Sequence, residues 1–247
     1  MQEMNFSASL LMPNSYFQFK QFVVHQEGCS MKVTTDACLF GAWTARQLTG
    51  KYERILDIGT GTGLLSLMMA QSNTAPIDAI EIQKTDFTRA LANVKASPWS
   101  QQIKVLYGDV LEYGFDTRYD VIVSNPPFYE ADLKGTSAGR NIAHHDEGLS
   151  LHDLAGALKK QLQFGGLFFL LFPAKREAEL ADELGQCGLF INRICFVQQT
   201  AAHSPFRIMV KGSFTKVPAV KQRILIRSGK EYSPEFTALL KPYYLHM

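Results

Sequence analysis

The sequence predicts an α/β fold with a mostly parallel sheet covered by helices. Beyond residue 50, short apolar runs alternate with stretches of helical periodicity, a rhythm typical of parallel strands joined by crossover helices. The first run ends in the glycine-rich turn DIGTGTG, and a helical stretch follows at once. From residue 189 the apolar runs follow one another without room for helices, so antiparallel strands should close the sheet.

The composition fits one large domain. The chain has 247 residues, of which 46% are apolar and 19% charged. It has no run of about 18 apolar residues, so we expect no membrane span. The start MQEMNFSASLLMPNS lacks the features of an export signal, which indicates a cytoplasmic protein. The four cysteines lack zinc-site spacing, so we expect free thiols.

The predicted elements alternate along the chain. The first five strands are expected at residues 54–58, 77–82, 103–107, 119–124 and 166–172. Helices are expected at residues 63–71, 84–96, 151–163 and 175–186. The fifth strand contains LFFLLF, which is apolar on both faces as a central parallel strand should be.

Before the first strand, residues 17–24 and 31–32 predict a small hairpin. A helix then begins near Asp36, and either Thr35 or Asp36 suits its N-cap.

After the fifth strand, strand-like runs occupy 189–198, 207–214 and 223–227. Either of the last two could lie between the fifth and sixth strands of a seven-stranded sheet. We expect a single domain over residues 1–247, with a hairpin-and-helix segment at 1–50 and a basic extension at 200–247.

The charge is concentrated at the carboxyl end. From Arg207 onward, eight Lys and Arg residues face two acids, a net charge of +6, and the rest of the chain carries −4. Such an end could bind a polyanion, because cations that neutralise phosphates release counterions. It could equally be a solubilising face. Arg223 and Arg227 are the candidates for contacts with RNA.

The glycine turn predicts a nucleoside cofactor. Gly59, Gly61 and Gly63 allow a ligand to approach the backbone closely, since no β-carbon stands in the way. Glu81, at the end of the second strand, can accept both hydroxyls of a ribose, and Ile82 follows it in the same site. Asp57 would repel a pyrophosphate but suits an ammonium and a sulfonium, so S-adenosylmethionine fits better than NAD.

The third strand adds two candidates to this site. Asp109 could accept a hydrogen bond from the adenine amino group, and Val110 could offer its backbone amide. Asp109 could instead be a turn residue that caps a loop.

The segment NPPF after the fourth strand predicts transfer of a methyl group to a planar amino group. The lone pair of such a nitrogen is delocalised, so two acceptors must draw the nitrogen toward tetrahedral geometry and stabilise its developing charge. Asn125 can supply its side-chain oxygen and Pro126 its carbonyl, while Pro127 holds the turn rigid. Phe128 can stack on the unstacked planar group. The alternative is a rigid turn with a core phenylalanine.

Through DIGTGTG, AIEIQ and NPPF the chain resembles the class I S-adenosylmethionine-dependent amino-methyltransferases, which implies their Rossmann-like fold. The segments QFVVHQEGCSMKVTTDACLFGAW and KEYSPEFTALLKPYYLHM resemble those of the bacterial tRNA1(Val) adenine-N6 methyltransferases, which modify the adenine beside the anticodon. This resemblance spans nearly the whole chain. It implies tRNA as the partner and places Lys32, Thr35 and Asp36 over the methionine end of the cofactor, although a helix cap explains Thr35 and Asp36 equally well.

Two other functions share these motifs. Release-factor glutamine methyltransferases use a near-identical loop on a protein amide, and an inactive RNA-binding module could keep the fold. Residues 131–146 should face the substrate, with Arg140, His144 and His145 as candidate contacts for RNA. Two adjacent histidines seldom make a metal site alone, so we expect no metal. We also expect a monomer.

Overall fold

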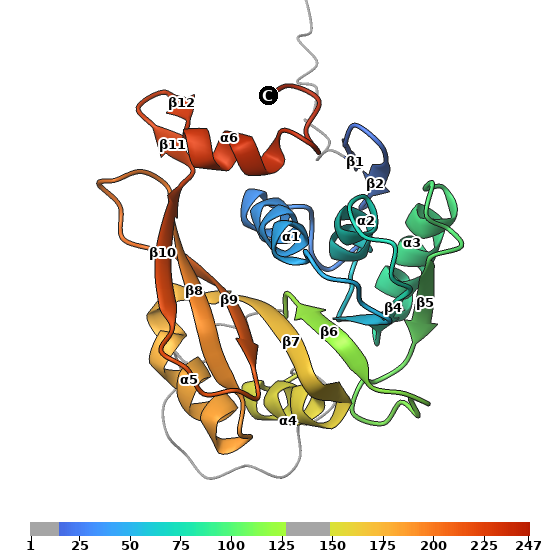
Figure 1. Ribbon diagram of the computed structural model, residues 1–247. Helices are drawn as coiled ribbons and strands as arrows, with labels where there is room; N and C mark the ends of the chain where they lie inside the picture. Colours follow the sequence, from blue (N-terminus) through green and yellow to red (C-terminus); the bar gives the residue numbers. More distant parts are fainter. Residues whose placement is uncertain (1–14, 127–148) are drawn as a thin grey trace, which may run out of the picture.

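A computed structural model describes residues 15–126 and 149–247. Its centre is an eight-stranded sheet of order β10-β8-β9-β7-β6-β3-β4-β5 (Figure 1). The strands of this sheet are β3 (Ile55–Ile58), β4 (Ile77–Glu81), β5 (Ile103–Tyr107), β6 (Tyr119–Ser124), β7 (Leu162–Pro173), β8 (Phe190–Gln198), β9 (Arg207–Ser213) and β10 (Val220–Leu225).

The strand directions confirm the predicted fold class. Strands β3 to β7 run parallel to one another, and β9 runs antiparallel to both β7 and β8. Strand β9 therefore fills the position between the fifth and sixth strands, which the sequence left open. The sheet also exceeds the predicted seven strands, because β10 pairs in parallel with the outer side of β8.

Helices cover the sheet in two layers (Figure 1). Helix α1 (Thr35–Gln47) and α2 (Leu64–Ala70) pack on one face with Phe169 and Met209 in a shared core. Helix α4 (Leu151–Gln161) and α5 (Glu177–Gln186) contribute to the core of the other face, together with Phe168 and Phe172. Helix α3 (Lys84–Lys95) contacts β4 and β5, and the short η2 (Ala174–Arg176) precedes α5.

Side-chain caps fix where α1 and α4 begin. The Thr34 hydroxyl accepts from the Ala37 amide, 3.4 Å away, so Thr34 is the N-cap of α1 and the expected caps Thr35 and Asp36 lie inside the helix. Ser150 caps α4 by accepting from the Asp153 amide at 3.1 Å.

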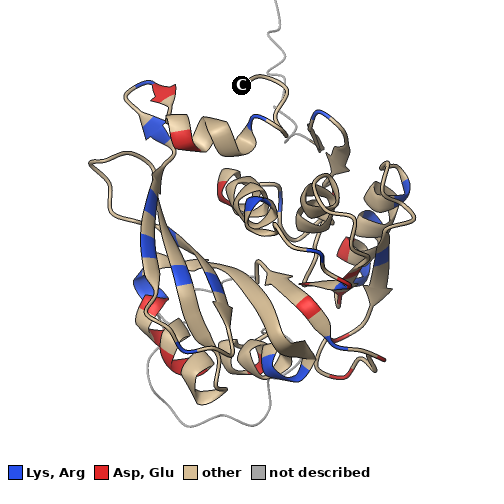
Figure 2. Cartoon of the chain, in the orientation of Figure 1, with Lys and Arg blue, Asp and Glu red and all other residues tan. Residues whose placement is uncertain are grey.

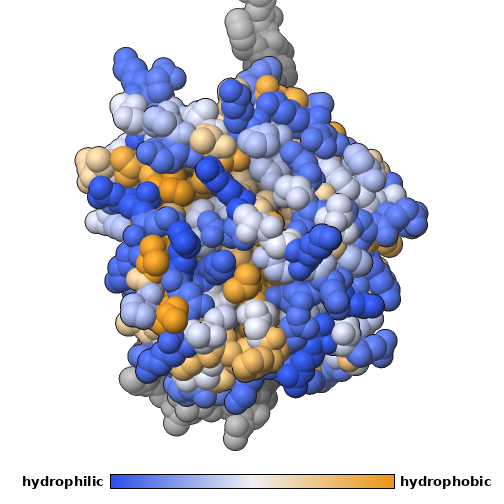
Figure 3. Space-filling view, viewed as in Figure 1, coloured by the Kyte–Doolittle hydropathy of each residue, from blue (hydrophilic) through white to orange (hydrophobic). Residues whose placement is uncertain are grey.

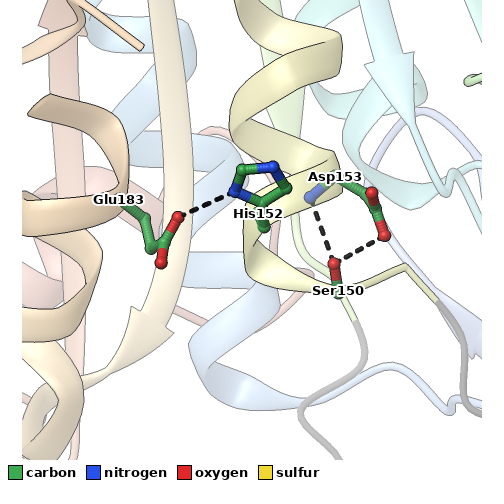
Figure 4. Close-up of polar contacts among 4 residues, drawn as sticks. All are labelled: Ser150, His152, Asp153 and Glu183. Atoms are coloured by element: carbon green, nitrogen blue, oxygen red, sulfur yellow. Dashed lines mark hydrogen bonds and ion pairs between the residues drawn. The ribbon is translucent and has the colours of Figure 1, made fainter. Parts of the chain in front are cut away.

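A polar contact also joins the two helices of the second layer. His152 on α4 lies 3.2 Å from a carboxylate oxygen of Glu183 on α5 (Figure 4). Both side chains therefore help to hold the first turn of α4 against α5.

The N-terminal hairpin contacts the C-terminal segment that follows residue 240. The N-terminal hairpin consists of β1 (Tyr16–Gln18) and β2 (Val23–His25), and the predicted strand at 31–32 is absent. The sequence did not predict β11 (Arg227–Ser228), β12 (Glu231–Tyr232) or α6 (Pro234–Leu240), which packs against α1. The Lys20 amide donates to the Tyr243 carbonyl at 2.8 Å. No helix in the described ranges is long and apolar enough to cross a membrane.

Gly212 on β9 provides a test of the strand order. A Cβ there would overlap both the Phe168 ring and the Phe190 backbone carbonyl, so β9 fits between its neighbours only with glycine at this position. Gly212→Ala should lower the free energy of unfolding by about 1–3 kcal/mol, as overpacking does. Urea denaturation measures this.

Gly156→Ala is the matched control, because nothing lies within 4 Å of a Cβ at this position in α4. Alanine should raise the free energy of unfolding there by roughly 0.5–1 kcal/mol through helix propensity. Equal effects of the two substitutions would contradict the packing described for β9.

Candidate active site

The predicted catalytic turn and the glycine turn leave the sheet side by side. Strands β3 and β6 are parallel neighbours, with Ile58 paired to Ser124. The Ser124 hydroxyl donates to the Ile58 carbonyl oxygen at 2.8 Å and ties the two strand ends together. Gly59 and Asn125 are the residues that follow this pair. Their backbones therefore lie roughly one strand spacing apart, about 5 Å. Asn125 is partly exposed and Pro126 is buried.

The glycine turn has a backbone that favours glycine. Gly59, Gly61 and Gly63 have φ values of 67°, 57° and 83°, in the left-handed region where other L-residues are strained. A Cβ at Gly59 or Gly61 would meet nothing within 4 Å. The turn therefore exposes backbone to open space at the carboxyl end of β3, and α2 begins directly after it at Leu64.

Asp57 lies beneath this turn and is fully buried. The hydroxyls of Thr60 and Ser66 donate to its Oδ2, each at 2.7 Å. Its Oδ1 has no hydrogen-bond partner in the described part of the chain. Burial raises the pKa of Asp57 to about 6, against the opposing effect of the two hydroxyl bonds. Oδ1 is closed off from solvent beneath the turn, so contact of Asp57 with a cofactor remains a prediction.

Glu81 fastens the glycine turn to β4. The Gly61 amide donates to one carboxylate oxygen and the Gln83 amide to the other, each at 2.9 Å. Burial raises the pKa of Glu81, and the backbone bonds oppose this rise. Each carboxylate oxygen has a further lone pair, so the predicted acceptance of ribose hydroxyls is compatible with these bonds.

The other predicted cofactor residues lie beyond β4 and β5. Ile82 is 52% exposed, so an apolar side chain is available beside Glu81. Asp109 Oδ1 accepts from the Leu111 amide at 2.9 Å, so Asp109 does cap a turn. Val110 is buried next to it. Contact of Asp109 and Val110 with an adenine remains a prediction.

Sequence reasoning missed Asn93, a buried residue of α3 that holds the glycine turn from behind. Its Oδ1 accepts from the His25 amide at 3.0 Å, and its Nδ2 donates to the carbonyls of His25 and Thr62, each at 2.9 Å. Asn93 thus joins the N-terminal hairpin to the turn. A buried asparagine on an otherwise amphipathic helix is the only signal that could have revealed it.

The three residues predicted at the methionine end of the cofactor have different surroundings. Lys32 is exposed, and Thr35 forms the first turn of α1. Asp36 is paired with Arg207 of β9, with 3.0 Å between Oδ2 and Nε. This pair fixes the start of α1 over the carboxyl end of the sheet.

The predicted RNA contacts also separate. Arg223 is exposed on the edge strand β10, whereas Arg227 lies over the Tyr232 ring, 4.8 Å from its centre, and donates to the Lys230 carbonyl at 2.7 Å. Pro127, Phe128, Arg140, His144 and His145 lie outside the described residues. Among the residues that the structure does describe, no group of three His, Cys, Asp or Glu side chains could hold a metal ion.

Solved structures share this architecture. A predicted O-methyltransferase from Agrobacterium tumefaciens aligns with a TM-score of 0.66 at 16% identity, covering 84% of this chain and 96% of that one. A Listeria monocytogenes protein described as a class I S-adenosylmethionine-dependent methyltransferase aligns with a TM-score of 0.58 at 16% identity, covering 85% of this chain and 72% of that one. The fold is that of class I S-adenosylmethionine-dependent methyltransferases.

Sequence comparison is more specific. The model of the methyltransferase small domain matches residues 43–149. A tRNA1(Val) (adenine(37)-N6)-methyltransferase from Dyadobacter fermentans is 39% identical over 238 residues, covering 94% of this chain and 98% of that protein. Its counterpart from Parabacteroides distasonis is 40% identical over 240 residues, covering 96% of this chain and all of that protein. The chain belongs to the tRNA1(Val) (adenine(37)-N6)-methyltransferase family.

The buried carboxyl of Asp57 predicts a pH dependence of stability. Its pKa of about 6 in the folded protein exceeds the ordinary value of 3.8, so the folded state binds the proton more tightly and stability falls as pH rises from about 4 to 6. Between pH 5 and pH 7 the unliganded protein should lose about 1 kcal/mol from this group. Asp57→Asn should remove that part of the slope.

Chemical denaturation at a series of pH values measures the slope. Asp116→Asn, which changes an exposed aspartate away from the turn, should behave as the wild type does. A slope unchanged in Asp57→Asn would show that Asp57 is ionised in the folded protein throughout this range.

Proposed function

We propose that this protein transfers a methyl group from S-adenosylmethionine to the exocyclic N6 of an adenine in tRNA, the adenine beside the anticodon of tRNA1(Val). The proposal depends on one observation: Asn125 follows β6 at the same edge of the sheet where the glycine turn follows the neighbouring strand β3. Membership of the tRNA1(Val) (adenine(37)-N6)-methyltransferase family supports the choice of substrate. The open space at Gly59 and Gly61 supports the choice of cofactor.

The chain would hold the cofactor through residues of β3 and β4. Asp57 would meet its cationic end, Gly59 and Gly61 would lie against it, and Glu81 would accept its ribose hydroxyls. When bound, the cofactor supplies an electrophilic methyl group on a sulfonium. Glu81 and Asn93 keep the glycine turn in place before binding, so little reorganisation is needed.

Asn125 and Pro126 would act on the nucleophile. The Asn125 side-chain oxygen and the Pro126 carbonyl accept the two amino hydrogens of adenine, which directs the nitrogen lone pair toward the methyl group and stabilises the positive charge that develops. The proton of the resulting cation passes to solvent, so no strong base is needed. The Ser124–Ile58 bond holds this strand end rigid, and Phe128 is proposed to stack on the base.

The surface for tRNA is proposed on the opposite half of the sheet from the cofactor. Strands β8, β9 and β10 carry five Lys or Arg residues and no Asp or Glu (Figure 2). Lys211 is paired with Arg193 across β8 and β9, and burial together with this neighbouring charge lowers the pKa of Lys211. Arg223 is one of these five, and Arg227 extends the basic surface beyond β10, with Arg140 as a further candidate. A phosphate backbone would relieve the repulsion among these cations.

Further parts of the proposal concern the setting of the reaction. Contacts of the N-terminal hairpin with α3, and of α6 with α1, support a single domain over residues 1–247. We propose that the protein works in the cytoplasm, which is consistent with tRNA as the substrate. We also propose that it works as a monomer and without a metal.

Asn125→Ala tests the division of roles. Loss of one preorganised acceptor should lower kcat by about a hundredfold or more and leave the affinity for S-adenosylhomocysteine nearly unchanged. Asn125→Asp keeps an acceptor oxygen and should recover part of the lost rate. Single-turnover methylation of tRNA and isothermal titration calorimetry measure the two quantities. Collapse of cofactor affinity in Asn125→Ala would refute the assignment.

A competition between substrates tests the choice of tRNA over a protein amide. Purified protein should form N6-methyladenosine in tRNA from a strain that lacks this protein, detected by nucleoside mass spectrometry. It should leave a release-factor peptide unmodified. Methylation of the peptide glutamine without any RNA product would replace the proposal with a protein glutamine methyltransferase.

A further inference from the structure

A cavity opens on the half of the sheet away from Glu81, Ile82 and Asp109. It has a volume of about 320 Å³ and lies at the carboxyl end of β8 and β10. Thr35 and Asp36 of α1 form one side, and Gln199 and Phe206 of the loop between β8 and β9 form another. The β11–β12 hairpin closes it with Arg227 and Tyr232. Figure 3 shows apolar surface where this loop lies below the hairpin.

The lining combines aromatic rings with a positive charge. Phe206 is 38% exposed and presents its ring to solvent. Tyr232 is 41% exposed, but its ring is stacked on Phe236, with 4.9 Å between the ring centres. The Arg227 guanidinium lies over the Tyr232 ring and is held there by its bond to the Lys230 carbonyl. The acid in the cavity, Asp36, is neutralised by Arg207. Aromatic faces beside a cation, without a free acid, suit a nucleotide: the base stacks on a ring and the phosphate pairs with the cation.

The cavity lies within reach of the catalytic turn. Ser124 is level with Leu170 of β7, so Asn125 is level with Leu171. The Phe206 carbonyl accepts a hydrogen bond from the Ala174 amide at 3.2 Å, which places Phe206 about three residues further along β7 than Asn125. Two strand spacings also separate β6 from β9. Together these place Phe206 roughly 14 Å from Asn125. Successive bases of a stacked strand are about 3.4 Å apart, so the cavity can receive a base within a few positions of the target adenine.

The position also distinguishes the cavity from the cofactor site. The cofactor candidates Glu81, Ile82 and Asp109 follow β4 and β5, whereas the cavity is built by the segments that follow β8 and β10 and by the start of α1. Thr35 and Asp36, predicted at the methionine end of the cofactor, are the cofactor candidates among its lining residues. Asn125 at the end of β6 lies between the two groups in the strand order. A ligand in the cavity therefore approaches the catalytic turn from the side opposite to the cofactor.

We propose that this cavity binds the base of a nucleotide near the methylated adenine, stacked on Phe206, with a phosphate on Arg227, which the Tyr232 ring supports. The inference rests on the proposed function, because it takes RNA as the substrate. A stacked neighbour would hold the strand while the target adenine is turned out toward Asn125. Phe206 and Tyr232 would then act as positioning residues for the RNA.

The experiment compares leucine variants on a 17-nucleotide anticodon stem-loop of tRNA1(Val). Phe206→Leu and Tyr232→Leu keep apolar bulk, so the fold should survive, but they remove the ring. Each should raise KM for the stem-loop about tenfold, with kcat and S-adenosylhomocysteine affinity within about twofold of wild type. Phe164→Leu is the control, since Phe164 is 94% exposed near the opposite end of β7.

Abasic substitution identifies the nucleotide. A series of stem-loops each lacks one base, at a position within three nucleotides of the target adenine on either side. For the wild type, KM should rise for the stem-loop that lacks the base bound in the cavity and not for the others. At that position the Phe206→Leu effect should shrink to less than about twofold, because no base remains to stack. Arg227→Gln should lower the slope of log affinity against log salt by about 1.

The outcomes separate this inference from the function on which it rests. Active wild type with unchanged KM in both leucine variants would overturn the nucleotide site and leave the methylation of RNA standing. A fall in S-adenosylhomocysteine affinity in Phe206→Leu would assign the cavity to the cofactor instead. Wild type that methylates no RNA would overturn the proposed function and this inference with it.

Discussion

The pairing of β3 with β6 is the constraint on which the site depends. Because the two strands are parallel and Ile58 pairs with Ser124, the glycine turn and Asn125 leave the same edge of the sheet as neighbours. The Ser124–Ile58 hydrogen bond secures that register at its last pair. A slip of one residue would turn every side chain of β6 to the opposite face and move the acceptor away from the turn. The remaining strands extend this edge in two directions.

The two directions have different chemistry. On one side, β4 ends in Glu81 and Asp109 follows β5. Burial raises the pKa values of Glu81 and of Asp57 on β3. Such groups favour a ligand with donors or positive charge. On the other side, β8 to β10 carry only basic charges, which favour phosphates. The catalytic turn lies at the boundary, where a cationic methyl donor and an anionic strand have to meet.

The cost of this arrangement falls on the unliganded protein. An unpartnered oxygen on a buried aspartate is unfavourable, and the structure tolerates it because Thr60, Ser66 and the surrounding core fix the carboxyl in place. Glu81 reduces its own cost by accepting from two backbone amides, which also orders the glycine turn. The site is thus stabilised by contacts that a ligand can add to without breaking.

Local patterns in the sequence predicted what local chemistry decides. The alternation of apolar runs located β3 to β8, and the glycine and proline signals located both turns, since each depends on residues within a few positions. Long-range pairing was harder: nothing in RIMVKGS itself shows that β9 lies between β7 and β8, because that depends on Gly212 fitting against Phe168. The roles of Asn93 and the Asp36–Arg207 pair escaped for the same reason, and α6 was missed because its seven residues give too short a pattern.

Hydrogen–deuterium exchange tests the central claim that β6 divides the cofactor from the RNA. S-adenosylhomocysteine should slow exchange at residues 59–63, 81–83 and 108–110, and the anticodon stem-loop added next should slow it at residues 199–206 and 226–232. Two results would contradict this division. One is protection of residues 199–206 and 226–232 by S-adenosylhomocysteine without RNA, and the other is RNA that protects only residues 59–63, 81–83 and 108–110.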